Sequence, residues 1–475
     1  MVFSSLYFLF LYLPIVLFVY YITPLKWRNA VLLVFNLIFY GWGEPVYIVI
    51  MFVSIAIDYT HGILVERCKR RGNDRGAKLA VASSVVFNLA LLFFFKYWDF
   101  VAGSLAAIGL DFMPKFGLSL PIGISFYTFQ TMSYTIDVYR GDAGVQRNIV
   151  NFGTFVTLFP QLIAGPIIKY KDLEEQIGHR THSVEQFASG VQVFVVGMGK
   201  KLLLANNLGM LWDAYQAVPT AELTVLGAWL GVVAFSFQIY FDFSGYSDMA
   251  IGLGRMLGFE FLKNFDYPYI SKSITEFWRR WHISLSTWFR DYLYIPLGGN
   301  RCSTWKHVRN ILMVWTLTGL WHGAAWNFLC WGLYFGLLLL GEKYGWGKQL
   351  GRAPAVAQHL YTMLLVVVSW VVFRAETLGY AGHFLGAMAG FAQSGWSDER
   401  TTYYLLQFRW ELLLAIPAAM PVKQWLQTWL EARRGTTWSQ VLLLWGPKLL
   451  ALGLFGLAFL RLVSSSFNPF IYFRF

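Results

Sequence analysis

Charged residues and cysteines are scarce in this 475-residue chain. Only 13% of the residues are charged, against about 25% in ordinary soluble domains, whereas 57% are hydrophobic and 19% aromatic. The composition therefore predicts a polytopic membrane protein. The cysteines, Cys68, Cys302 and Cys330, lie far apart without CxxC spacing. This spacing excludes a disulfide framework and a zinc knuckle.

Several familiar enzyme motifs are also missing. The chain has no HExxH metalloprotease motif and no GxSxG nucleophile elbow. His282, His307 and His322 lack metal-ligand spacing, so we expect no metal and no bound cofactor. The net charge of +12 comes from Lys and Arg residues between apolar runs, as the positive-inside rule expects, and does not indicate nucleic-acid binding.

The apolar runs predict an all-α protein with about 11 transmembrane helices. A span needs about 20 apolar residues, and the early runs 3–22, 46–64 and 79–101 satisfy this length. The loop 66–78 holds six basic residues and is therefore expected on the cytoplasmic side. Counting back from that loop places the N-terminus outside the cytoplasm.

Two apolar runs do not fit simple spans. The run 152–168 contains Pro160 and Pro166 and is flanked by basic loops, which predicts a re-entrant hairpin beside a cavity. The run 310–341 would form a helix of about 48 Å, longer than the roughly 30 Å apolar core of a bilayer. We therefore expect a break at 319–323 and two or three re-entrant pieces in all. One membrane domain is predicted over 1–475, with its core at 118–341, C-terminal helices at 355–463 and a tail at 470–475.

Residues 276–294 predict one amphipathic helix. Phe277, Trp281, Leu285, Trp288 and Tyr292 share an apolar face, while Arg279, Ser286 and Arg290 share the other, with His282 at its edge. Central arginines are costly in a spanning helix. The segment is therefore either an interfacial anchor or the lining of a cytoplasmic entrance for an anionic substrate.

His322 is an ionisable residue within an apolar run. A buried neutral imidazole can be purely structural, but an ionisable group at membrane depth favours a functional role. Histidine titrates near neutral pH and can take a proton from a hydroxyl. Gly319 and Gly323 beside it would allow another backbone or a thin acyl chain to approach closely.

A polar cluster interrupts the apolar run 239–254. Its two carboxylates cannot face lipid, so they either pair with basic groups such as Arg279, Arg280 or Arg290 or take part in chemistry. Pairing is the favoured role. The cluster consists of Asp242, Ser244, Ser247 and Asp248.

Long runs of uncommon residues resemble one family. FQIYFDFSGYSDMAIGLG at 237–254, SITEFWRRWHISLSTWFRDYLYIPLGGNR at 273–301 and GLWHGAAWNFLCWG at 319–332 are similar to the membrane-bound O-acyltransferases, in the bacterial branch that acetylates alginate and peptidoglycan. The resemblance extends over most of the chain up to about Gly341 and fades until the extreme C-terminus.

The resemblance implies a site. His322 would be the catalytic histidine and His282 the second signature position, in the fold of that family, where two cavities meet near the catalytic ring. Arg279, Arg280, Trp281, Arg290, Asp242, Ser244, Asp248 and Asn327 would bind donor or substrate, with Arg301, Lys306 and Arg309 further candidates for the donor phosphates. In the terminal FIYFRF, Tyr472 is either an interfacial anchor or an acetyl relay.

These features together predict a multi-pass O-acetyltransferase of the bacterial inner membrane. It would move acetyl from a cytoplasmic donor, most simply acetyl-CoA, to a periplasmic SGNH-type partner or an extracytoplasmic polysaccharide, with membrane lipids around it. A transporter or export channel is the alternative, although no inverted repeat is visible. A passive scaffold would need neither His322 nor the polar cluster.

Overall fold

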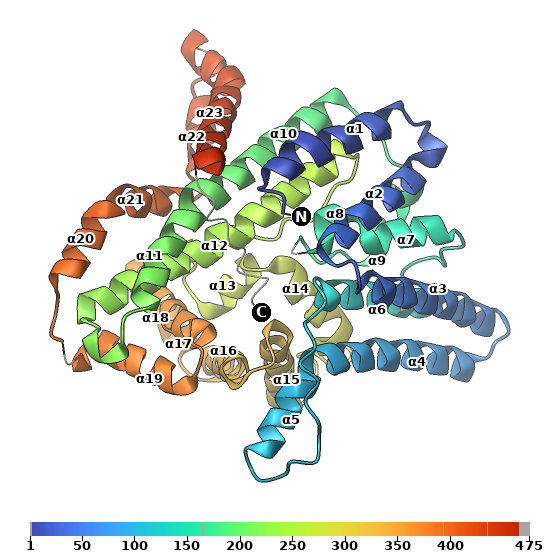
Figure 1. The fold of residues 1–475 in the computed structure, drawn as a ribbon, viewed down its shortest axis with the longest axis horizontal. Coiled ribbons are helices and arrows are strands. Elements are labelled where there is room, and N and C mark those ends of the chain that lie inside the picture. Colours follow the sequence, from blue (N-terminus) through green and yellow to red (C-terminus); the bar gives the residue numbers. More distant parts are fainter. Residues whose placement is uncertain (1, 164, 393, 435, 465–475) are drawn as a thin grey trace. The chain divides into compact units, whose positions relative to one another are not determined.

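The structure is entirely helical in the residues it describes. The computed structural model describes residues 2–163, 165–392, 394–434 and 436–464, and none of these ranges contains a strand (Figure 1). The all-α prediction is confirmed. The chain forms two compact units, one from its beginning to Val191 together with Met249–Leu262, the other from Gln192–Asp248 and the chain from Lys263 onward.

The first unit is built around α6. Nearly every residue of this helix is buried, and α3, α4, α7 and α9 pack against it. Its core is partly polar, because the buried carboxylate of Asp58 accepts hydrogen bonds from Ser84 and Asn88 at 2.5 to 3.0 Å. The helices are α1 (Leu13–Ile22), α2 (Arg28–Gly43), α3 (Ile48–Arg70), α4 (Asp74–Leu92), α5 (Trp98–Ala106), α6 (Ile124–Arg140), α7 (Ile149–Thr157), α8 (Phe159–Leu162), α9 (Tyr170–Gly178) and the start of α10 (Val184–Gly199).

The second unit contains both histidines that the sequence singles out. A cluster of large aromatic side chains, among them Trp281, Trp331 and Trp370, forms its core. Its helices are α11 (Asn206–Gln216), α12 (Val225–Met256, whose last turns belong to the first unit), α13 (Ile274–Arg280), α14 (Ile283–Phe289), α15 (Thr304–His322), α16 (Trp326–Tyr344), α17 (Gly347–Leu350), α18 (Ala355–Arg374), α19 (Leu378–Gly386), α20 (Glu399–Gln407), α21 (Arg409–Ala418), α22 (Val422–Glu431) and α23 (Thr437–Ser464).

Six helices in the described ranges are long and apolar enough to cross a bilayer. Only 6% of the apolar stretch of α23 is buried within the protein, which suits a helix surrounded by lipid. The figure of about 11 spans therefore stays a prediction. The six are Ile48–Arg70, Asp74–Ala106, Val184–Gln216, Val225–Met256, Ala355–Arg374 and Thr437–Ser464.

The segment predicted to be a re-entrant hairpin forms two short helices. α7 has nine residues and α8 has four, and both are too short to span a bilayer. The two helices are separated at Leu158, whose backbone is non-helical, and Pro160 lies in the first turn of α8. The placement of this hairpin in a membrane remains a prediction.

Candidate active site

His322 lies where the chain folds back on itself. It is the last residue of α15, and after a short turn α16 begins at Trp326 and runs antiparallel to α15. The predicted break is therefore present, but the two helices form a hairpin and not one interrupted span. A helix end leaves backbone groups without intrahelical partners, and this end places His322 beside the turn.

The hairpin requires glycine where α15 and α16 touch. A Cβ on Gly319 would lie 2.3 Å from the carbonyl oxygen of Phe328, and one on Gly332 would lie 2.3 Å from that of Trp315. At Gly323 the ring of Phe328 occupies the corresponding space. The sequence allowed either another part of the protein or an acyl chain to approach these glycines. In the structure the space beside them is filled by protein atoms of α15 and α16.

Aromatic rings surround the His322 side chain. The rings of Trp321 and Trp331 lie 5.1 Å from it between centroids and that of Phe373 lies 5.4 Å away, all three in edge-to-face geometry. The residue is 5% exposed. Such packing restricts the imidazole to one orientation, as a catalytic group requires.

His282 lies in a break between two helices, which corrects the sequence-based prediction of one helix over 276–294. α13 ends at Arg280 and α14 begins at Ile283, because His282 adopts a left-handed backbone with φ 44°. Such a conformation costs a non-glycine residue about 1–3 kcal/mol and is typical of functional sites. Burial nevertheless follows the predicted pattern, since the five residues of the apolar face are buried.

Asn264 stabilises this break. The backbone N–H of Ile283 donates to its carbonyl at 2.9 Å, and the N–H and hydroxyl of Ser284 donate to its side-chain oxygen at 3.2 and 2.9 Å. Its amide nitrogen donates to the hydroxyl of Ser247 at 2.9 Å. The first backbone N–H groups of α14 are thereby satisfied without an unbroken helix.

The same contacts fix the tautomer of His282. The Nδ1 atom of His282 lies 3.2 Å from Asn264 Oδ1, an atom that must be oxygen because it accepts from the backbone of Ser284. Nδ1 therefore carries the hydrogen, and in the neutral ring Nε2 holds a lone pair. Among the described residues Nε2 has no hydrogen-bond partner, although His282 is only 1% exposed.

The fold brings the two histidines together. Their ring centroids are 6.5 Å apart, and Trp321 lies 5.8 Å from His282. Phe243 from α12 packs against His282 at 4.6 Å. Two imidazoles held in place, one with an acceptor nitrogen that bonds to no described residue, are groups that can take a proton from a hydroxyl.

In the described ranges the ion pairs of the predicted acidic cluster are with lysines, whereas the sequence suggested arginines. Lys200 binds Asp248 at 2.7 Å, and Lys201 binds Asp242 in a nearly fully buried ion pair. α10 and α11 form one continuous helical segment, and the two lysines lie where they join. This segment packs along α12, which carries both aspartates, so the lysines reach the carboxylates directly. Ser244 Oγ has no hydrogen-bond partner in the described part of the chain.

The predicted binding arginines differ in what surrounds them. Arg280 binds Glu276 at 2.9 Å and Asp266 at 3.3 Å, and Arg290 binds the neighbouring Asp291 at 2.9 Å. Arg279 is exposed. Of these three, Arg279 has the charge most available to a ligand.

The remaining predicted residues have packing contacts or lie elsewhere. Trp281 is buried in the aromatic core against Trp370. Asn327 donates to backbone carbonyls at the end of α18, including that of Ala375 at 3.0 Å, and so holds Phe373 against His322. Tyr472 lies outside the described residues.

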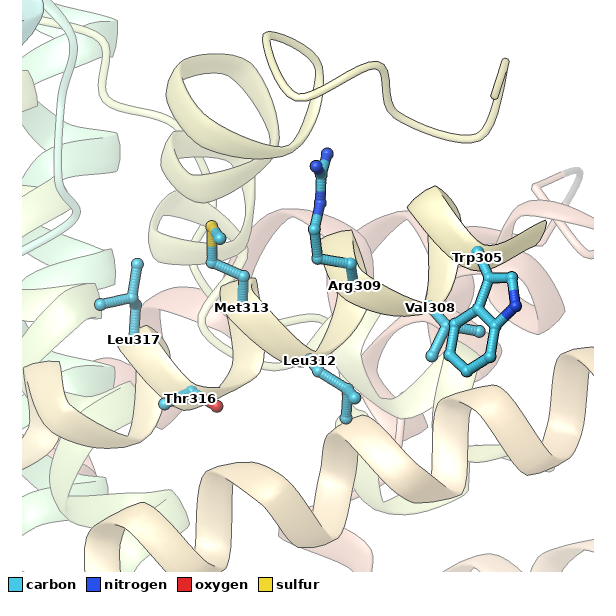
Figure 2. A pocket seen from close by; sticks show the side chains of 7 residues that line it. All are labelled: Trp305, Val308, Arg309, Leu312, Met313, Thr316 and Leu317. Atoms are coloured by element: carbon cyan, nitrogen blue, oxygen red, sulfur yellow. The ribbon is translucent and has the colours of Figure 1, made fainter. Parts of the chain in front are cut away.

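A cavity of about 660 Å³ lies along one face of α15 and does not include either histidine. It is open, and the residues that line it all belong to α15 (Figure 2). Among the described residues Arg309 is its one charged lining residue, and the exposed Lys306 and Arg301 lie nearby in sequence. The lining residues are Trp305, Val308, Arg309, Leu312, Met313, Thr316 and Leu317.

Sequence reasoning missed Asn264. Its local sequence, KNFDYPYI, carries no catalytic pattern, and its partner His282 lies 18 residues further on. Only the left-handed backbone at His282 reveals why an asparagine is needed there.

Comparison with known proteins identifies the family of this chain. The membrane-bound O-acyltransferase family matches residues 142–373, a range that includes both histidines. The probable alginate O-acetylase AlgI of Azotobacter vinelandii is 41% identical over the full length of both chains. The probable alginate O-acetylase AlgI of Pseudomonas aeruginosa is 47% identical, and the match covers 82% of this chain and 75% of the relative. The peptidoglycan O-acetyltransferase of Helicobacter pylori is 31% identical, and the match covers 82% of this chain and 80% of the relative.

The chain belongs to the membrane-bound O-acyltransferase family. It is a multi-pass membrane protein and an O-acyltransferase, which confirms the resemblance seen in the sequence. These relatives favour an enzyme over the alternatives of a transporter and a scaffold.

Proposed function

We propose that this protein transfers acetyl groups from cytoplasmic acetyl-CoA across the bacterial inner membrane. The acceptor is a periplasmic SGNH-type partner or an extracytoplasmic polysaccharide such as alginate or peptidoglycan. The pairing of two oriented, buried histidines at 6.5 Å supports this reaction most directly. The names of the relatives, alginate O-acetylase and peptidoglycan O-acetyltransferase, support a polymer as the final acceptor.

In this proposal His322 acts as the general base. The acceptor hydroxyl gives its proton to His322 while its oxygen attacks the acetyl carbonyl carbon. A carbon–oxygen bond forms, the carbon–sulfur bond of the thioester breaks, and the proton passes to the leaving sulfur as free thiol. His282 accepts a hydrogen bond through Nε2 and holds the reacting group in line. Arg279 contributes charge for the donor phosphates, and Tyr472 is retained as a candidate acetyl relay.

The His322→Ala variant tests the assignment. We expect it to lower transfer by at least about 10²-fold, the usual contribution of general acid–base catalysis, with little loss of folded protein. The measurement is release of free thiol from acetyl-CoA, and of labelled acetyl onto glycan fragments, by purified protein in vesicles. The matched control is His383→Ala on α19, where the histidine is exposed. Full transfer by His322→Ala would remove this residue from the mechanism.

A further inference from the structure

Two arginines of the first unit share one buried tyrosine. The guanidinium carbons of Arg28 and Arg180 lie 4.9 and 5.6 Å from the ring centroid of Tyr20, which is fully buried. Arg180 Nε donates to the Tyr20 hydroxyl at 2.8 Å, and the same hydroxyl lies 2.8 Å from His182 Nε2. Arg28 reaches the His182 ring at 3.2 Å. The two cations are therefore joined through the same two side chains.

Neither cation has a carboxylate partner among the residues that the structure describes. In the described ranges no Asp or Glu oxygen lies within ion-pair distance of Arg28 or Arg180, whereas Arg70 and Arg147 of the same unit both bind Glu66 at 2.7 Å. The two guanidinium carbons lie 4.9 and 5.6 Å from the centre of the Tyr20 ring, and like charges gathered around one side chain repel each other. An anion bound by both guanidinium groups would offset that repulsion.

Neutral groups already orient both side chains. Arg28 Nε donates to the Thr23 carbonyl at 3.1 Å, and Arg180 Nη1 donates to Asn29 Oδ1 at 2.7 Å. Arg180 Nη2 makes no hydrogen bond to any described residue, and both arginines are only half-buried. Burial, and then the charges of Arg28 and Arg180, lower the pKa of His182, so the ring adds no positive charge at neutral pH.

We propose that Arg28 and Arg180 form a binding site for a phosphate group. Guanidinium groups present paired N–H donors in a fixed fork that matches phosphate oxygens. The site lies apart from both catalytic histidines in the chain and does not depend on the reaction proposed for them.

The phosphate has two possible sources, a lipid headgroup or a soluble molecule. Leu25 and Trp27, in the turn between α1 and α2, are 68% and 59% exposed on either side of Lys26. Exposed apolar and aromatic side chains next to a lysine are typical of a membrane interface. This neighbourhood favours the headgroup of an anionic phospholipid.

The test measures retained lipid on the full chain. Purified protein is equilibrated in nanodiscs of phosphatidylcholine alone or of an equal mixture with phosphatidylglycerol, released into detergent, and weighed intact by native mass spectrometry. We expect phosphatidylglycerol to be retained selectively and retention to fall about tenfold in Arg28→Gln and in Arg180→Gln, as for loss of charge-assisted hydrogen bonds. Arg75→Gln is the matched control, an exposed arginine of the same unit outside the cluster.

A second arm identifies a soluble source. Pyrophosphate is titrated into the lipid-depleted protein, and thermal unfolding is followed. Stabilisation that is lost in Arg28→Gln but kept in Arg75→Gln would assign the site to a soluble phosphate. The proposal would be overturned if wild type and Arg28→Gln retained phosphatidylglycerol equally and were stabilised equally by pyrophosphate. It would also be overturned if Arg75→Gln lost as much lipid retention as Arg28→Gln. Arg28→Gln serves alone if Arg180→Gln fails to fold.

Discussion

At the scale of single residues, aromatic rings pack against both histidines. Three rings contact His322 edge-to-face, and Phe243 contacts His282, which also forms a hydrogen bond with Asn264. A hydrogen bond selects a tautomer and aromatic packing does not. Asn264 is therefore a positioning residue in the proposed reaction.

The Asn264→Asp variant tests that role. A carboxylate facing Nδ1–H would stabilise the charged imidazole, so we expect the acid limb of the pH–rate profile to move to higher pH by about one unit or more. The reason is that the reaction needs the neutral ring, which then persists only at higher pH. The measurement is the rate of thiol release across pH.

Asn310→Asp serves as the control for this variant. Asn310 is also buried and donates to the carbonyls of Leu297 and Gly299. It lies about 18 Å before His322 along α15. We expect it to lower stability without moving the profile, and an unmoved profile in Asn264→Asp would exclude the positioning role.

At the scale of elements, the α15–α16 hairpin sets the position of His322. The two helices approach closely at Gly319 and Gly332 because neither residue carries a Cβ. The fixed separation brings Trp331 of α16 against the His322 ring. A change that separates the helices should therefore disturb the ring of His322, the proposed general base.

The Gly319→Ala variant tests this coupling. Its Cβ would lie 2.3 Å from a backbone oxygen, so the helices must move apart, at a cost of about 1–3 kcal/mol. We expect a lower midpoint of thermal unfolding together with reduced transfer. The control is Gly453→Ala in α23, where nothing lies within 4 Å and alanine favours the helix. Equal stability of the two variants would contradict the packing argument.

At the scale of the whole molecule, charge distribution predicts the orientation in the membrane. The basic loop between α3 and α4 is expected in the cytoplasm, and the turn between α2 and α3 on the opposite side together with the N-terminus. Arg75 and Val46 are exposed and report these two positions.

Single-cysteine labelling checks this orientation. In a variant whose three natural cysteines are replaced by serine, Val46→Cys should react with an impermeant maleimide added outside right-side-out vesicles, and Arg75→Cys should not. Opening the vesicles with detergent should make both react, which controls for accessibility. Reaction of Arg75→Cys in sealed vesicles would reverse the predicted topology.

The sequence by itself determined the class of this protein, and it singled out the two histidines that are proposed to act. Apolar runs of bilayer length require helices, because backbone groups within a bilayer core must bond internally. The period of apolar residues over 276–294 also predicted which side chains are buried, although the helix is broken there. That pattern depends only on local spacing.

The tertiary structure decided what each polar group meets. Asn264 at His282, Lys200 and Lys201 at the aspartates, and Phe328 at Gly319 are partners from distant parts of the chain or from across a turn. Local spacing carries no information about them, because contacts between distant segments form only when the helices pack. For the same reason the break at His282 could not be predicted, since the groups that satisfy it come from another segment.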